Sequence, residues 1–282
     1  MEVLARDPIP ACIGKALVAM LALWKDVNMV RRVCLCVVTA GFVATAWCRG
    51  AEMPDQDKDD PKVYLGGGAM VTSRPYAGVD TRVYPVPLFV YEGKRLYLRG
   101  LFAGYRLLMA DGWSVGPIVQ PRFEGYEEDD SFALKGMDDR PWSLDAGIGI
   151  SWLTKIGLLG MSGVTDTLGR HNGQELEFSY TILFKLGGFD LIPSAGMRWK
   201  SHDLVDYYYG VRSEEARAGR PAYEGEDAFD PFMRLAVRRK LTERWSLVAA
   251  AQHEWLDDEI SDSPIVDRDY DVSFIVGMLY SW

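Results

Sequence analysis

Residues 272–282 read V-S-F-I-V-G-M-L-Y-S-W, and this stretch decides the fold. In an extended strand, one face would carry Val272, Phe274, Val276, Met278, Tyr280 and Trp282, all of them apolar. A wholly apolar edge strand invites aggregation in a soluble protein, so we expect this strand to face lipid. An ordinary core strand is the alternative for this segment taken alone.

Composition limits the class of protein. The chain has 282 residues, a formal charge of -9, 48% apolar residues and 12% aromatic residues, which is enough for one large domain or two small ones. It contains no run of 18 apolar residues, so we expect no membrane-spanning helix. The acidic balance argues against nucleic acid as a partner.

The N-terminal region has the features of a secretory leader. Arg31 and Arg32 precede an apolar run at 33–46, which has the length of a signal-peptide core. We predict an upstream non-native extension at 1–28, a signal peptide at 29–50 and a disordered polar lead-in at 51–61; an extended signal-peptide start is the alternative for 1–28. All four cysteines lie in the leader, which excludes a disulfide scaffold or a cysteine zinc site from the mature domain at 62–282.

From residue 62 onward, polar and apolar residues alternate with period two, as in strands, and no segment shows the helical period of 3.6. Two tryptophan pairs, Trp142/Trp152 and Trp245/Trp255, lie ten residues apart on apolar faces. Ten strand residues rise ~33 Å, which a tilt of ~40° projects to ~25 Å, the height of a lipid-facing band. We therefore predict that these four tryptophans form aromatic girdles.

Short turns alternate with long polar segments along the chain, which is typical of outer-membrane barrels with periplasmic turns and extracellular loops. Eleven strand segments can be assigned. Since bacterial barrels have even strand numbers, we interpret the phase change within 95–109 as a turn. The prediction is an all-β, transmembrane, antiparallel up-and-down β-barrel of about 12 strands, with 10 as the alternative.

Candidate chemistry is sparse. The three histidines, His171, His202 and His253, are far apart in sequence, and we predict His171 in a turn and His253 on the lipid-facing row. No nucleophile, base and orienting group can be placed together, so we predict no enzyme, no catalytic residue, no metal site and no cofactor. The inward-facing rows carry charges of both signs. These charges fit either a narrow solute channel or a closed lumen with paired charges.

Several motifs resemble the MltA-interacting protein (MipA/OmpV) family. They are V-D-Y-Y-Y-G-V-R-S-E-E-A at 205–216, R-P-A-Y at 220–223, D-S-P-I-V at 262–266 and L-K-G-M-D-D-R at 134–140. The resemblance covers the whole mature domain. It implies a Gram-negative outer-membrane barrel that acts as a scaffold between a murein transglycosylase and a murein synthase, or that serves in envelope maintenance.

From the residues and the resemblance together, we predict a non-enzymatic scaffold or interaction protein, with a narrow small-solute channel and a surface adhesin as alternatives. The expected partners are outer-membrane lipid or lipopolysaccharide, the barrel-assembly machinery and the two murein enzymes. The predicted family-specific residues are Asp206, Tyr207, Tyr208, Tyr209, Gly210, Ser263 and Pro264. The predicted barrel-assembly signal consists of Phe274, Val276, Met278, Tyr280 and Trp282.

Overall fold

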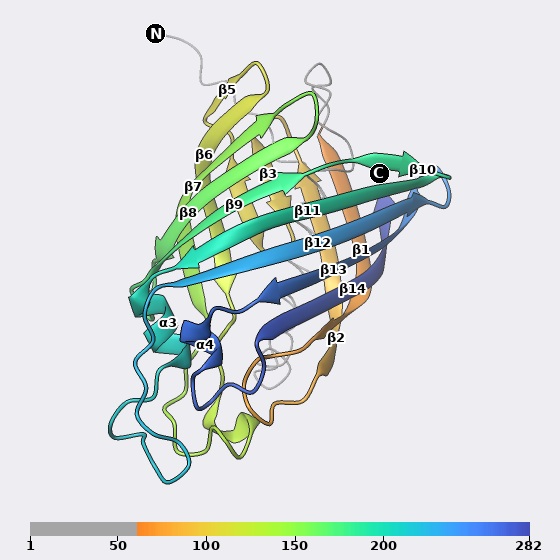
Figure 1. Cartoon of the computed structure of the whole chain (residues 1–282). Helices are drawn as coiled ribbons and strands as arrows, with labels where there is room; N and C mark the ends of the chain where they lie inside the picture. Colours follow the sequence, from red (N-terminus) through yellow and green to blue (C-terminus); the bar gives the residue numbers. More distant parts are fainter. Residues whose placement is uncertain (1–60) are drawn as a thin grey trace.

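The computed structural model describes residues 61–282, which form an antiparallel up-and-down β-barrel (Figure 1). The predicted leader and lead-in at 1–60 lie outside the described residues. The strands are β1 Lys62–Thr72, β2 Arg82–Glu92, β3 Leu96–Arg99, β4 Phe102–Tyr105, β5 Leu108–Ala110, β6 Trp113–Arg122, β7 Ser143–Leu153, β8 Leu158–Asp166, β9 Gln174–Thr181, β10 Phe184–Leu186, β11 Phe189–Lys200, β12 Ala228–Lys240, β13 Trp245–Trp255 and β14 Tyr270–Ser281.

The strand number follows from the pairing. β4 and β5 both pair with β6, and β9 and β10 both pair with β11, so each of these pairs forms one interrupted wall strand. The barrel therefore has 12 wall strands, and the prediction of 12 is confirmed. The doubtful segment 95–109 does contain a turn, at Gly100, where φ is +62°. Glycine adopts this left-handed conformation without the steric cost that a Cβ brings.

The barrel closes where β1 pairs with β14, from Tyr64 opposite Ser281 to Thr72 opposite Ser273. On β14 the predicted alternation is confirmed, since Phe274 is exposed whereas Ile275 is buried. At the same seam Gly68 lies so close to β14 that an added Cβ would stand 2.3 Å from the carbonyl oxygen of Val276. The first and last strands can therefore approach this closely only because glycine is present.

The two ends of the barrel differ. One end, here called the turn end, carries the short connections 93–95, 111–112, 154–157, 187–188 and 241–244. The other, here called the loop end, carries 73–81, 123–142, 167–173, 201–227 and 256–269. Three helices lie in these long loops: η2 Glu128–Asp130, α3 His202–Tyr209 and α4 Asp258–Ser261. Figure 1 shows α3 and α4 side by side at the loop end.

The expectation that no segment after residue 62 is helical was wrong for α3. Its eight residues make barely two turns, so the periodicity is too brief to stand out in the sequence. The buried residues Leu204, Val205, Tyr208 and Tyr209 nevertheless follow an i, i+1, i+4, i+5 pattern. Among the described residues, none of the helices has the length and hydropathy needed to cross a bilayer.

Candidate functional site

The long loops form a compact structure over the loop end, here called the cap: residues 73–81, 123–142, 201–227 and 256–269. The cap has its own hydrophobic core, because side chains from all four loops bury one another. The main members are Tyr76, Val79, Tyr126, Leu134, Met137, Leu204, Val205, Tyr208, Tyr209, Val211, Leu256, Ile260 and Ile265. Flexible, solvated loops would lack such a core, so the cap is an ordered, packed part of the fold.

Tyrosines form the centre of the cap. The hydroxyl of Tyr76 donates to the carbonyl oxygen of Glu124 at 2.6 Å, and its ring stacks on that of Tyr209 at 5.7 Å. Tyr126 meets Tyr76 edge-on at 4.8 Å. Three loops are thereby joined through one aromatic cluster. Burial raises the pKa of Tyr208 and of Tyr126, because the phenolate would lose its hydration.

A buried ion pair joins two of these three loops at a second place. Nη2 of Arg140 lies 2.9 and 3.0 Å from the two carboxylate oxygens of Glu215, and Nε of Arg140 donates to the carbonyl oxygen of Tyr207 at 2.8 Å. Arg140 and Glu215 are 3% and 4% exposed, so this contact is shielded from water. Burial opposes ionisation of Glu215, but backbone N–H groups of Asp138 and Arg212, together with Arg140, lower its pKa.

The last long loop is fixed by Ser263. Its hydroxyl donates to the carbonyl oxygen of Tyr209 at 2.5 Å, and Ile265 packs in the cap core. Pro264, between them, follows α4 and has no N–H to donate. The four motifs that carry the family resemblance, at 134–140, 205–216, 220–223 and 262–266, are thus in mutual contact, although up to about 130 positions separate them in the chain.

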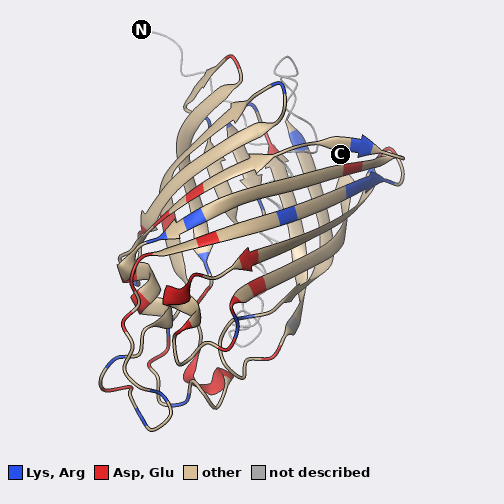
Figure 2. Cartoon of the chain, in the orientation of Figure 1, with Lys and Arg blue, Asp and Glu red and all other residues tan. Residues whose placement is uncertain are grey.

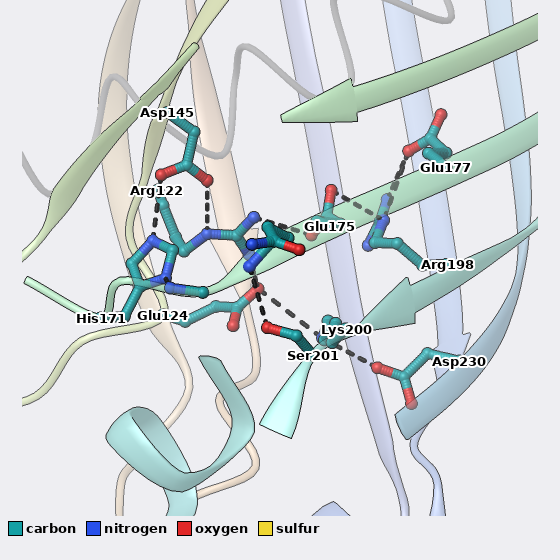
Figure 3. A network of polar contacts seen from close by, with 12 residues as sticks. Arg122, Glu124, Asp145, His171, Glu175, Glu177, Arg198, Lys200, Ser201 and Asp230 are labelled. Carbon is teal, nitrogen blue, oxygen red and sulfur yellow. Dashed lines mark hydrogen bonds and ion pairs between the residues drawn. The ribbon is translucent and has the colours of Figure 1, made fainter. Parts of the chain in front are cut away.

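Below the cap, charged side chains of the barrel wall form a polar network (Figure 3). Arg122 of β6 bonds to Asp145 of β7 at 2.7 Å and to Glu175 of β9 at 2.8 Å. Figure 2 shows acidic and basic bands side by side on β9, β11 and β12 near the loop end. Asp145 and Glu175, two of the inward charges indicated by the sequence, therefore pair with a buried arginine.

The other half of the network centres on Arg198 and Lys200 of β11. Arg198 contacts Glu177 at 3.0 Å and Glu254 of β13 at hydrogen-bond distance. Lys200 lies 2.8 Å from Asp230 and 3.3 Å from Glu254. It also lies 3.7 Å from Glu124 in the cap, so the network connects the wall to the cap. Since buried charges are costly unless paired, these contacts offset the desolvation of the charged groups at the loop end.

His171 is part of this network, which the sequence did not reveal. Its Nε2 lies 3.0 Å from Asp145, and its Nδ1 accepts the N–H of Gly173 at 3.1 Å. The Nδ1 contact assigns the proton to Nε2, which then donates to Asp145. Both ring nitrogens are occupied, and the nearby Ser143 hydroxyl donates to Asp166 at 2.5 Å. This arrangement contains no free base beside a nucleophile, so it serves as structural bonding.

Asp145, Asp166 and His171 also lie close enough together to be considered as metal ligands, with ligand atoms within 4.8 Å of one another. Their donor atoms are already used, however. Asp145 accepts from Arg122 and His171, and Asp166 accepts from Ser143 and from the backbone N–H groups of residues 168 and 170–172. A cation would have to break these bonds, so the group does not fit a metal site.

The structure also places the tryptophans predicted for the girdles, His253 and two residues of the predicted family motif. Trp142, Trp152, Trp245 and Trp255 are all 40–46% exposed, with Trp142 just before β7 begins. His253 lies on the same outward row as Trp255, with ring centroids 4.4 Å apart. Asp206 and Gly210 lie at the end of α3, where the N–H of Gly210 donates to the carbonyl oxygen of Asp206 at 2.8 Å.

Comparison with known proteins agrees with this architecture. The family model "MltA-interacting protein MipA" matches residues 65–282. The MltA-interacting protein of Escherichia coli (strain K12) is 32% identical over 224 residues, which cover 78% of this chain and 90% of that protein. The outer membrane protein Omp26La of Vibrio anguillarum is 29% identical over 181 residues, or 64% of this chain and 70% of that protein.

The outer membrane protein OmpV of Vibrio cholerae is 30% identical over 142 residues, which cover 50% of this chain and 55% of that protein. These relatives and the barrel architecture agree on an outer-membrane location. The matched region begins in β1 and extends through β14, so it includes the complete barrel and the cap. The chain belongs to the MltA-interacting protein (MipA) family of outer-membrane β-barrels.

Proposed function

We propose that this barrel is a scaffold that binds murein-remodelling enzymes, among them a murein transglycosylase, through its turn end. In outer-membrane barrels the short turns face the periplasm and the long loops face outward. The turn end would then stand next to the murein layer. The similarity to a protein named for its interaction with MltA supports a transglycosylase as the partner.

The observation that carries the proposal is the chemistry of the short turns. Large apolar side chains are exposed at or beside three of them: Ile156 at 74%, Leu186 at 66% and Leu241 at 49%. Polar residues and glycine are the usual choice for such solvated turns. Exposed apolar groups gathered beside water are typical of protein-binding surfaces. We infer that these turns form the enzyme-binding surface.

The test is capture of a purified MltA-type murein transglycosylase by the barrel embedded in lipid vesicles. The double substitution Ile156→Asp and Leu241→Asp is expected to weaken binding at least about tenfold, or ~1.4 kcal/mol. The matched control is Phe132→Asp, since Phe132 is 84% exposed but lies in the cap. Equal capture by all three proteins, or loss only with the cap variant, would refute the proposal.

The runner-up is a small-solute channel. The ion pairs from Arg122 to Glu175 and from Lys200 to Glu124 connect separate parts of the wall and the cap, and charges that satisfy one another select ions poorly. We therefore expect no steady single-channel steps in planar bilayers. Regular openings of uniform size would favour the channel over the scaffold.

Three supporting roles belong to the same proposal. Trp142 and Trp255 would mark the outer membrane interface and Trp152 and Trp245 the inner one, with Trp152 stacked on Trp113 at 4.6 Å. The outward row of β14, from Phe274 to Trp282, would be the segment that the barrel-assembly machinery binds. Exposed acidic groups in the cap, in the clusters 127–130 and 257–259, would contact lipopolysaccharide through divalent cations.

A further inference from the structure

The barrel wall is incomplete on one side. β3 and β4 have only four residues each, whereas β2 has 11 and β6 has 10. β3 pairs with β2 only at Val90–Glu92, and β4 pairs with β6 only at Val119 and Ile118. Residues 82–88 of β2 and 120–122 of β6 thus have no strand beside them on this side. We call this opening the wall gap.

Prolines occupy both edges of the wall gap. In β2 the carbonyl oxygen of Phe89 accepts from the N–H of Gly100, so the odd-numbered residues direct their backbone groups to the gap. Pro85 and Pro87 are among them. In β6 the carbonyl oxygen of Val115 accepts from Leu107, which places Pro121 on the gap-facing edge by the same alternation.

The prolines reduce the cost of an open edge in the membrane. A backbone N–H left without a partner in hydrocarbon costs several kcal/mol, and proline has none to leave. Proline also prevents another strand from pairing along that edge, because the ladder would lack its donors at alternate positions. The prolines therefore disfavour pairing of a further β-strand along the edges of the gap, either from this chain or from a second copy.

Beside the gap, β2 carries apolar side chains on both of its faces. Toward the lumen, β2 presents Val86 and Leu88, which join the apolar side chains that line β11 to β14 and β1. Toward the membrane, Val83 is 67% exposed and Pro85 and Pro87 are exposed as well. A hydrocarbon chain could pass from one face to the other without crossing a polar barrier.

A cavity of about 100 Å³ lies behind the loop-end corner of the gap. It is lined by residues 120–124 at the end of β6, by Thr72 of β1 and by Glu254 of the network. Gln120 and Arg122 line the cavity, and Pro121 between them is buried and lines it as well. The cavity thus reaches the free edge of β6, and polar groups stand within it.

We propose that the wall gap is a lateral opening that admits the acyl chain of an outer-leaflet amphiphile into the barrel, with the polar part of the molecule held near the cavity. The position fits the outer leaflet, because the β6 edge of the gap ends at Phe123, whose ring stacks on that of Trp142 at 5.7 Å. This opening is independent of the scaffold proposed for the turn end.

The test places a fluorescent probe inside the gap. The described domain contains no cysteine, so a bimane label can be attached to Val86→Cys, with Leu88→Cys as a second site should the first fail to fold. The protein is reconstituted in phosphatidylcholine vesicles whose acyl chains carry bromine, which quenches bimane on contact. Phe274→Cys, on the lipid-facing row, is the positive control, and Ala250→Cys is the lumen-facing control within fully paired wall.

The proposal expects fluorescence loss at Val86 or Leu88 close to that at Phe274, and none beyond background at Ala250. Quenching no greater at either gap site than at Ala250 would overturn it. Quenching equal at all sites would do the same, since lipid would then enter elsewhere.

A second variant closes the gap beside Val86. Insertion of Thr-Val-Thr-Val before Gly100 and of Val-Thr-Val-Thr after Leu101, combined with Pro87→Val to restore the missing backbone donor, lets the lengthened β3 pair with residues 86–89 of β2. The proposal expects this insertion to abolish quenching at Val86 while heat-modified gel migration shows an intact barrel. Quenching that persists in the lengthened barrel would also overturn it.

Discussion

Arg140→Ala should open the cap and leave the barrel intact. The substitution removes the two bonds to Glu215 and the bonds to the carbonyl oxygens of Tyr207 and Asp138. It also leaves the carboxylate of Glu215 buried without its counter-charge. Removing one partner of a buried ion pair typically costs about 3–5 kcal/mol.

Much of this cost falls on the cap, because Arg140 contacts residues of two cap loops and none of the strands. Local opening of the cap should therefore become more frequent by about 10²- to 10³-fold. The measurement is amide hydrogen exchange, followed by mass spectrometry, for peptides that cover 201–227 and, for comparison, β12 and β13. Exchange should accelerate in the former and stay slow in the latter.

Arg212→Ala is the matched control. Arg212 pairs with Asp138 at 2.9 Å, but the two side chains are 47% and 69% exposed. Exposed pairs contribute about 1 kcal/mol or less, so its exchange rates should change little. If Arg140→Ala accelerates exchange no more than Arg212→Ala, or if the strands open together with the cap, the idea of an independently stabilised cap is wrong.

Three further outcomes are expected. Folding lowers the pKa of Glu215, so the ionised carboxylate stabilises the cap above the ordinary pKa of 4.5, and this stabilisation is lost as the pH falls below that value. Amide exchange in the cap, measured at pH 7 and at pH 3, should show the loss. Glu215→Gln should remove this pH dependence. Gly68→Ala should lower the stability of the barrel by about 1–3 kcal/mol through overpacking, and so lower the temperature at which the folded gel band disappears. Gly67→Ala should leave that temperature unchanged, because its added Cβ meets nothing closer than 3.9 Å. Equal melting temperatures for the two variants would refute the close-approach argument. Ser263→Ala should raise exchange at Tyr209 and its neighbours by roughly fivefold, because one buried hydrogen bond of about 1 kcal/mol is lost, and unchanged exchange would show that this hydrogen bond does not stabilise the cap.

The sequence alone determined the barrel. Strand alternation is local, so each segment such as 272–282 or 228–240 reveals its two faces without knowledge of its neighbours. Turn residues such as Gly187 and Gly188 mark the strand ends in the same way. The even strand number then resolved the 95–109 segment correctly, because a closed barrel constrains the count.

The functional surfaces depended on tertiary structure. Nothing in the sequence joins Arg140 to Glu215, or Ser263 to Tyr209, because these contacts are made between loops that only barrel closure brings together. His171 looked like part of a turn, and only the placement of β7 beside the 167–173 loop reveals its bond to Asp145. The prolines of β2 and β6 could be read singly as edge residues. Only the tertiary structure shows that these prolines flank one gap, because β3 and β4, which lie between β2 and β6, have only four residues each. Strand pairing is determined by the closed sheet and not by the local sequence.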